Sequence, residues 1–219
     1  MEPAYAQALD WLLCDALTHV AGQREETTPE LRPTELAFYF RLTTRPIDQT
    51  PFAQARERLG EALLRSQVIA GAYRLVDGRA DFNEKELPNA PVVHLVGTGA
   101  IMPEVLIAAA ELAKEGIECE IIDPRTLQPL DTDLIVDSAK KTNRVVVVHE
   151  AVRFGGLGGE IASQIQELAF DYLDAPVTRI GAPFSPVPFS PALEQHYIPD
   201  AKTILTGVRE IMQRNVIRG

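Results

Sequence analysis

The 219-residue sequence contains only two cysteines, few aromatic residues and fewer basic than acidic side chains. Cys14 and Cys119 are too few and too isolated for a disulfide framework or a cysteine metal site, which is typical of a reducing compartment. We therefore expect a cytoplasmic protein. The formal net charge of −10 argues against nucleic acid and against an anionic membrane surface as partners.

The sequence also lacks a long apolar run. Trp11, Leu12 and Leu13 are consecutive, but Asp10 and Asp15 lie on either side of them and no basic segment precedes them. A membrane span needs about 20 apolar residues, and a signal peptide needs a positively charged start. We expect neither in this segment.

Several catalytic motifs are missing. The chain has no Gly-x-Ser-x-Gly elbow, no Walker loop, and no cysteine with a plausible base nearby in sequence. His19, His94 and His196 are scattered and have no partners at metal-ligand spacing. A self-contained hydrolase and a histidine metal site are therefore not expected.

What is present after residue 91 is a regular alternation of apolar strands and amphipathic helices. The predicted strands are Val92–Val96, Cys119–Ile122, Arg144–Val148 and Pro176–Ile180. The predicted helices are Met102–Lys114, Asp131–Lys141, Glu160–Tyr172 and Ala201–Arg214. This rhythm predicts an α/β fold with a mainly parallel sheet and helices on both faces.

The first 76 residues follow a different pattern. Pro3–Val20 has helical periodicity, 22–33 is polar and predicts an exposed loop, and Glu35–Thr44 is aromatic-rich and predicts a strand that ends before Pro46. A further helix is expected over Phe52–Ala70 and a strand over Ala72–Val76. One helix and one strand cannot bury two apolar faces, so this region should dock on something else.

These patterns divide the chain into three parts. We expect residues 1–78 to be the tail of a second α/β domain with its connector. The charged, turn-rich stretch 79–90 is expected to be a linker, and 91–219 the main domain.

Two glycine-containing turns carry the candidate binding residues. Gly97, Thr98 and Gly99 follow a strand and precede a helix, so their N–H groups could hold a phosphate. Ile101 and Met102 stand where the third glycine of a dinucleotide fingerprint would lie. The alternative is a glycine turn that lets the helix and strand pack closely.

The second turn lies in the stretch RVVVVHEAVRFGGLGGE, which predicts a buried strand, a glycine turn and a helix start. His149 and Glu150 are adjacent, so on a strand they should point to opposite faces. Either one could face a cleft, or His149 could simply be a structural hydrogen-bonding residue. Arg153 could form an anion site with Gly155, Gly156, Gly158 and Gly159, or these glycines could form a tight turn at a subunit contact.

The segments DPRTLQPLDTDLIVDSAKKTNRVVVVHEA, GGLGGEIASQIQELAFDYLDAPVTRI and PFSPVPFSPALEQHYIP resemble the C-terminal transketolase-type domain of thiamine-diphosphate enzymes, particularly the β subunit of 2-oxo-acid dehydrogenases. The resemblance runs from about Val92 to the end. PAYAQALDWLLCDAL, ELAFYFRLTT and IAGAYRLVDG are similar to the end of the pyrimidine-binding domain in single-chain pyruvate dehydrogenase components.

The resemblance implies a portion of an enzyme that supports dimerisation and closes the active-site channel. In that family thiamine diphosphate and magnesium are held by a Gly-Asp-Gly motif in an N-terminal domain, and a glutamate early in the middle domain activates the cofactor. This sequence has no Gly-Asp-Gly motif and starts after the region of that glutamate. We therefore expect no catalytic and no cofactor-binding residue in this chain alone.

The partners implied are the remaining domains or subunit, a second copy of the chain, and a lipoyl acyltransferase complex. The substrate stays open among pyruvate, branched-chain 2-oxo acids and sugar phosphates. Two alternatives remain from the residues themselves. One is a stand-alone regulatory module that binds a nucleotide or another anion, and the other is a pure assembly subunit with an exposed apolar face on Pro3–Val20.

Overall fold

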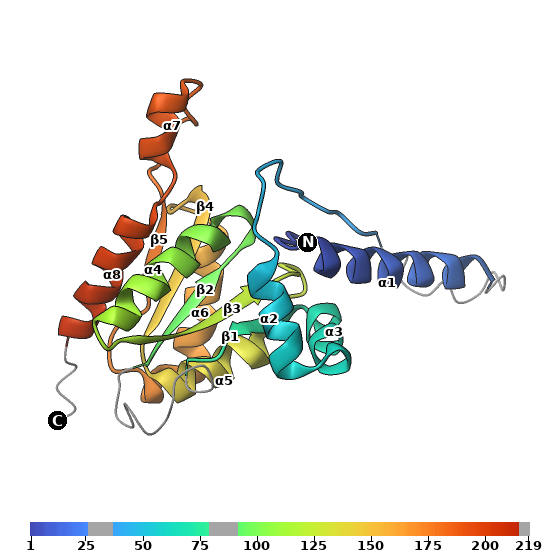
Figure 1. Ribbon diagram of the computed structural model, residues 1–219, viewed down its shortest axis with the longest axis horizontal. Helices are drawn as coiled ribbons and strands as arrows, with labels where there is room; N and C mark the ends of the chain where they lie inside the picture. The colour runs from blue at the N-terminus through green and yellow to red at the C-terminus, as the bar shows by residue number, and fades with distance from the viewer. Residues whose placement is uncertain (26–36, 79–91, 215–219) are drawn as a thin grey trace.

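The computed structural model describes residues 1–25, 37–78 and 92–214, and these contain one five-stranded sheet (Figure 1). The strands are β1 (Ala72–Val76), β2 (Val92–Gly97), β3 (Glu118–Pro124), β4 (Val145–Val152) and β5 (Thr178–Ala182). Their spatial order is β1-β3-β2-β4-β5. β1 is antiparallel to β3 and every other neighbouring pair is parallel, which confirms the mainly parallel α/β sheet.

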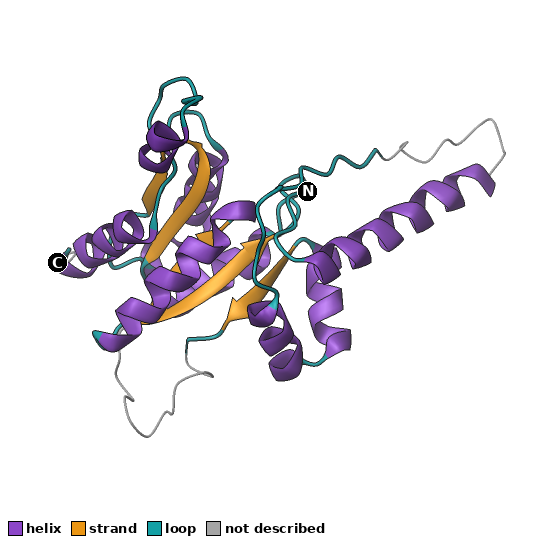
Figure 2. Cartoon of the chain, turned by 45° about the horizontal axis from the view of Figure 1, so that its top comes forward, coloured by secondary structure: helices purple, strands orange, loops and turns teal. Residues whose placement is uncertain are grey.

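Helices cover both faces of this sheet, as Figures 1 and 2 show. The α-helices are α1 (Ala6–Glu25), α2 (Thr50–Leu59), α3 (Glu61–Ala70), α4 (Met102–Lys114), α5 (Thr132–Thr142), α6 (Leu157–Ala169), α7 (Pro191–Tyr197) and α8 (Ala201–Gln213). On one face Val105 of α4 and Val208 of α8 belong to the same buried cluster as Leu95 of β2. On the other face Ile135 of α5 and Ile161 of α6 join a second cluster. The sheet is therefore the middle of three layers.

The central strands are apolar because both of their faces are covered. All of β2 and β3 is buried, as are the first five residues of β4, from Val145 to His149. A parallel sheet with helices on both sides requires such continuous apolar runs. Within the part of the chain that the structure describes, no helix is both long and apolar enough to span a membrane.

The predicted helix Phe52–Ala70 is two helices. α2 and α3 meet at Gly60, whose φ of 79° lies in the left-handed region. Glycine takes this conformation without a steric penalty, so the chain can turn there. The apolar periodicity on the two sides of Gly60 is typical of one continuous helix, so the sequence pattern did not indicate the break.

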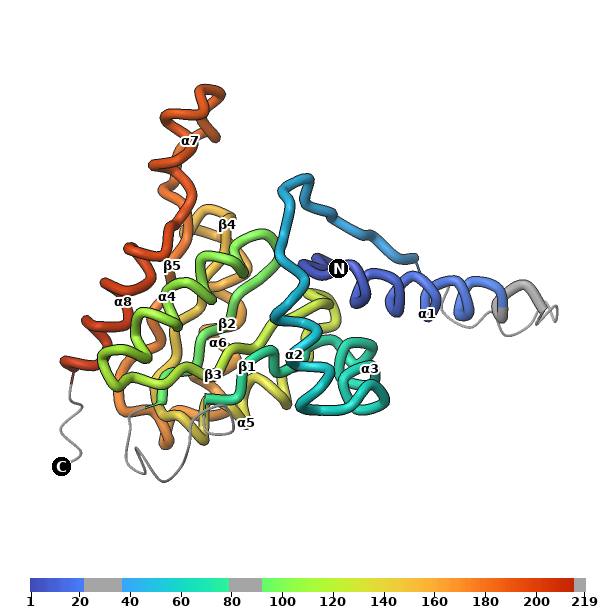
Figure 3. Tube along the Cα trace, viewed as in Figure 1, coloured from blue at the N-terminus to red at the C-terminus, as the bar shows by residue number. Residues whose placement is uncertain are grey.

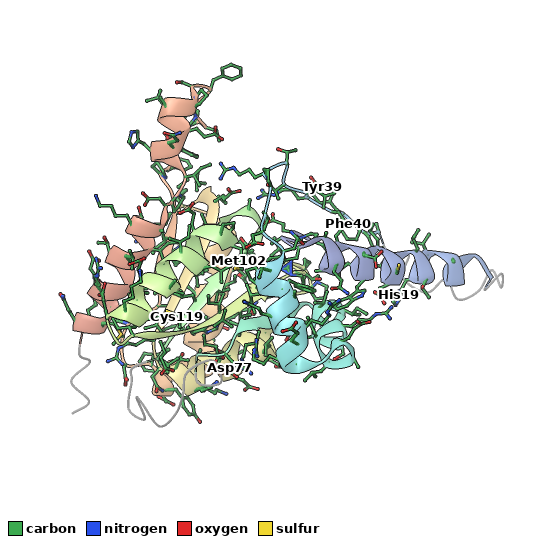
Figure 4. All side chains as sticks on the ribbon, in the orientation of Figure 1. His19, Tyr39, Phe40, Asp77, Met102 and Cys119 are labelled. Carbon is green, nitrogen blue, oxygen red and sulfur yellow. The ribbon has the colours of Figure 1, made fainter. Side chains whose placement is uncertain are left out.

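The predicted strand Glu35–Thr44 is wrong over its described residues, 37–44, which contain no strand. This segment runs beside α1, and Figure 4 shows Tyr39 and Phe40 on it. Phe40 packs against the core, whereas Tyr39 is 76 % exposed. A strand needs a neighbouring strand for its backbone hydrogen bonds, and residues 37–44 pair with none of the five strands of this sheet.

α1 is longer than the predicted helix Pro3–Val20, because it extends to Glu25. It therefore includes the start of the loop predicted over 22–33; the rest of that loop lies outside the described residues, as does the linker 79–90. The first half of α1 packs on the domain through Trp11 and Leu12, and the helix then projects from the body (Figure 3).

Further differences between prediction and structure lie after β4. α6 begins at Leu157 rather than Glu160, so two of the turn glycines lie inside the helix. A short 3-10 helix, Phe170–Tyr172, follows α6. α7 was not predicted at all. β5 is shifted two residues from the predicted Pro176–Ile180.

Candidate functional site

The carboxyl ends of β2 and β4 open into a cavity of about 510 Å³, called the first cavity below. Its walls come from the start of the chain, the segment 41–45, the turn after β2, the end of β4 and the region of α7. The carboxyl edge of a parallel sheet is where open α/β folds place ligands. The first cavity is therefore the position at which this fold is expected to carry a site.

Ion pairs connect the charged side chains of the first cavity. Arg41 lies 2.8 Å from Glu2, measured between guanidinium nitrogen and carboxylate oxygen. Arg45 lies 3.5 Å from Glu150 and 3.8 Å from Glu194 of α7. These contacts connect four segments that are far apart in sequence. The cavity can accept polar groups and shield them from water, but both of its arginines are already paired with its three glutamates.

A buried polar cluster anchors the chain start that forms one wall. The Glu2 N–H donates to the Arg125 carbonyl at 2.9 Å, and the fully buried Arg125 side chain pairs with the Asp123 carboxylate. Tyr73 donates its hydroxyl to the other oxygen of Asp123 at 2.9 Å. Burial raises the pKa of Asp123 to about 6, and the Arg125 charge opposes that shift.

The two glycines of the predicted phosphate turn, Gly97 and Gly99, have different roles. A side chain on Gly97 would lie 3.0 Å from Val105 of α4, so this glycine permits close packing of helix and strand. Thr98 is buried. Gly99, with a φ of 61°, lines the first cavity beside Glu2. The packing explanation therefore accounts for Gly97, while Gly99 belongs to the site.

His149 and Glu150 do point in different directions, as their adjacency on a strand predicts. Glu150 lines the first cavity, whereas the His149 ring is only 3 % exposed and packs against glycines. Side chains on Gly156 and Gly181 would lie 2.9 and 2.8 Å from Cε1 of this ring. Burial lowers the pKa of His149; a contact with the Ala151 backbone opposes this shift, and the nearby charge of Arg179 adds to it.

Arg153 and Gly155 line a separate cavity of about 730 Å³, which also contains Arg179 and Gly181 of β5. It is called the second cavity below. The two cavities share no lining residue, although they lie on either side of the end of β4. The structure thus divides the candidate residues into two groups, with Gly99 and Glu150 in one and Arg153 and Gly155 in the other.

Sequence reasoning missed several residues that line these cavities. They are Glu2, Arg41, Arg45, Glu194, Tyr197 and Arg179. Arg41 lies in the segment Glu35–Thr44 predicted as a strand, and Arg45 directly follows it; two basic residues near a proline are the only local signal. The carboxylates that pair with them come from distant segments, which no local pattern reveals.

The described residues offer limited chemistry of their own. Among residues 1–25, 37–78 and 92–214, no group of three or more His, Cys, Asp or Glu side chains is placed to hold a metal ion. The ionisable groups of the first cavity are arginines and glutamates that pair with one another. The geometry favours positioning and exclusion of water over proton transfer.

Comparison with known proteins gives consistent matches over the second half of the chain. Residues 85–204 match the family described as "Transketolase, C-terminal domain". The chain is 38 % identical over 149 residues to the beta subunit of acetoin:2,6-dichlorophenolindophenol oxidoreductase from Bacillus subtilis (strain 168), which covers 68 % of this chain and 42 % of that protein. It is 43 % identical over 111 residues to the pyruvate dehydrogenase E1 component subunit beta of Rickettsia felis, which covers 51 % and 34 %.

A solved structure of a related protein also matches this chain. The protein titled "Split gene transketolase, inactive beta4 tetramer" matches with a TM-score of 0.52 and 26 % sequence identity, covering 67 % of this chain and 43 % of that one. The chain spans less than half of the length of each of these proteins. With more than half of its residues matched by one family pattern, the chain belongs to the transketolase C-terminal domain family.

Proposed function

We propose that this chain supplies the C-terminal domain of a thiamine-diphosphate-dependent enzyme of the 2-oxo-acid dehydrogenase group. In the assembled enzyme it contributes to subunit contacts and to the wall of the active-site channel. The observation that carries this proposal is the first cavity, which lies at the carboxyl edge of β2 and β4 and whose charges are paired within its own walls. Such a surface can shape a channel without supplying a reacting group.

The residues present do not fit the anchor of the cofactor. The whole sequence lacks a Gly-Asp-Gly motif, and the described residues contain no cluster of metal ligands. A magnesium ion bound to diphosphate needs carboxylate and carbonyl oxygens at close range. We therefore propose that thiamine diphosphate and magnesium bind to other domains of the complete enzyme.

The names of the relatives narrow the substrate class. They are an acetoin oxidoreductase and pyruvate dehydrogenase components. We propose a small 2-oxo acid such as pyruvate, or a related small ketone such as acetoin, as the substrate of the complete enzyme. A branched-chain acid and a sugar phosphate are less well supported, because the relative that carries the transketolase name is more distant in sequence.

Association with other chains is part of this proposal. The relatives are named as subunits, and the structural match is titled a tetramer. On α1 the side chains of Leu13, Leu17 and Val20 are 41 %, 67 % and 37 % exposed at helical spacing. An exposed apolar stripe marks an interaction surface. We propose that a partner subunit or a second copy covers it, with a lipoyl acyltransferase as a further partner, in the cytoplasm.

A domain exchange tests the proposal. The matching C-terminal region of the Bacillus subtilis acetoin oxidoreductase beta subunit is replaced by that of this chain, and acetoin-dependent reduction of 2,6-dichlorophenolindophenol is measured in the assembled enzyme. We expect assembly and measurable activity. A chimera that folds but neither assembles nor reduces the dye would contradict the proposal.

Calorimetric titration of the 219-residue chain with thiamine diphosphate and magnesium provides an independent check. We expect no saturable heat that requires magnesium, because the residues that anchor the magnesium diphosphate lie elsewhere. Saturable micromolar binding to this chain alone that requires magnesium would show that the cofactor site had been misplaced.

A further inference from the structure

The second cavity differs from the first in that its arginines have no carboxylate partner among the described residues. Arg153 lies in the turn after β4 and Arg179 on β5, and both also line an adjoining cavity of about 750 Å³. Neither side chain forms an ion pair or a hydrogen bond with another residue in the described part of the chain. Two unpaired guanidinium groups on one wall are suited to an anion with several oxygens.

The surroundings of these arginines are also basic. The adjoining cavity adds Lys202 and Arg214, against the acidic Asp200 and Glu210. Asp200 already accepts hydrogen bonds from the backbone and hydroxyl of Thr203, so it caps α8. The cavities together have four basic and two acidic side chains, although the whole chain has a net charge of −10. Positive charge is thus concentrated at this place.

The start of α6 adds a second source of positive potential. Its N-cap residue, Gly156, forms no side-chain cap. A side chain on Gly159, in the first turn, would lie 3.3 Å from Nη1 of Arg179. The Arg179 guanidinium therefore lies beside the N-terminus of a 13-residue helix, where the helix dipole favours an anion.

A buried imidazole lies behind the same wall. His149 is 97 % buried, and neither ring nitrogen makes a hydrogen bond of normal geometry with a described residue, although the Ala151 backbone lies close enough to raise its pKa. The ring packs against Gly181, which lines the second cavity and has no side chain to separate them, and Nδ1 lies 3.2 Å from where such a side chain would begin. An unpartnered buried polar group is costly unless something satisfies it.

Two exposed aromatic rings complete the second cavity. Phe154 and Phe184 are 71 % and 75 % exposed, and their ring centroids are 5.0 Å apart at an interplanar angle of 65°. Both line the second cavity with the two arginines. An aromatic face beside guanidinium groups offers a planar base a stacking surface while its phosphates meet the positive charge.

We propose that the second cavity binds a nucleoside phosphate, whose phosphates contact Arg153, Arg179 and the start of α6 and whose base stacks on Phe154 or Phe184. This site is separate from the first cavity and does not depend on the function proposed above. A nucleotide bound there would act on the assembled enzyme as an effector, because the second cavity contains no group placed for chemistry on it.

Calorimetric titration of the full chain with ATP, and separately with pyrophosphate, tests the site. We expect saturable binding of both, with ATP bound more tightly. Arg153→Gln and Arg179→Gln should each weaken both ligands about tenfold or more, since each removes a charge-assisted contact. Phe154→Ala should weaken ATP alone. The matched control is Arg65→Gln on the exposed face of α3, which should bind like the parent.

The unfolding temperature of every variant shows whether it is folded, so a loss of binding can be assigned to the site. Absence of saturable ATP binding by the folded parent would overturn the proposal, and so would arginine variants that bind ATP like the parent. If ATP and pyrophosphate bind equally and Phe154→Ala changes neither, the nucleotide assignment is wrong. If the variants lose only assembly with a partner chain, this face is a subunit contact.

Discussion

The two cavities at the carboxyl edge of the sheet place arginine in opposite electrostatic settings. In the first, Arg45 lies 3.5 Å from Glu150 and 3.8 Å from Glu194, so its charge connects segments of the protein. In the second, Arg153 and Arg179 meet no carboxylate within the described ranges. An arginine whose charge is paired holds segments of the protein together, whereas an arginine without a carboxylate partner is available to bind a ligand.

The supports beneath the cavities differ as well. Behind the first cavity lies a buried ion pair, Asp123 with Arg125, which hydrogen-bonds to the chain start. Behind the second cavity lies His149. Burial lowers the pKa of this histidine, and its ring fits only because its neighbours are glycines. One support depends on compensated charge and the other on close packing, so different substitutions should break each.

Asp123→Asn should give the largest effect, because it leaves the Arg125 charge buried without its partner. At pH 7.5 Asp123 is ionised, since its pKa is raised only to about 6. We expect a loss of about 3–5 kcal/mol in unfolding free energy, measured by urea denaturation. Asp137→Asn on the exposed side of α5 is the control and should change it by less than about 0.5 kcal/mol. Equal effects of the two would contradict the role of the ion pair.

A second buried histidine, His94, can be tested through the pH dependence of stability. It is fully buried in β2, and burial lowers its pKa to about 4; Glu120 opposes the shift, while Arg74 and Lys141 add to it. The unfolded chain therefore binds more protons than the folded one between pH 6.5 and 4, and stability falls as pH falls through this window.

We expect the His94 contribution to reach about 3 kcal/mol at the acid end of that window. His94→Val should remove it, and the measurement is the difference in unfolding free energy between parent and variant at pH 7 and pH 4.5. The difference cancels groups that do not interact with His94. Glu120 is not one of them: burial opposes ionisation of Glu120, but the hydrogen bonds from Lys141 and Ser138 lower its pKa, and the His94 charge lowers it further. Parallel pH profiles for the two proteins would show that His94 does not titrate in this way.

Gly158→Ala tests the packing beneath the second cavity. Its added side chain would collide with Nε2 of His149, and overpacking of this kind costs about 1–3 kcal/mol. The same substitution in a His149→Ala background should cost little, which a double-mutant cycle in urea would measure. Gly159→Ala, in the same turn but facing only the flexible Arg179 side chain, is the matched control and should change stability by less than about 1 kcal/mol.

The smallest effect is expected at the rim of the first cavity. Arg45 is 49 % exposed, so Arg45→Gln should lower unfolding free energy by less than about 1 kcal/mol. The loss should shrink further in 0.5 M salt, because salt screens exposed pairs. A loss of several kcal/mol would mean that this pair fixes the fold as strongly as Asp123 with Arg125.

The parallel part of the fold could be predicted because its signals are local. Val145–Val148 are consecutive and apolar, and α4 begins with Pro103 in its first turn, so strand and helix were indicated within a few residues of their observed bounds. The segment 37–44 could not be assigned in the same way. Aromatic residues indicate a strand only when a neighbouring strand is available, and that depends on the whole sheet.

The candidate site was only partly predictable for the same reason. Adjacency on a strand was enough to separate His149 from Glu150. It could not show that Arg45 would meet Glu150, or that Arg179 would join Arg153, because each pair joins segments separated by a helix or more. The role of Gly158 as space for a histidine ring was likewise invisible, since a glycine before a helix has the same local pattern whatever lies beneath it.

The sequence by itself therefore determined the α/β class, the central strands and the positions of the two glycine turns, because periodicity and backbone preference act over a few residues. The tertiary structure alone decided that β1 closes the edge antiparallel to β3, that residues 41–45 cover one cavity, and that the two arginines of the other meet no carboxylate in the part of the chain that the structure describes. Those features depend on which distant segments meet, and only the folded chain brings them together.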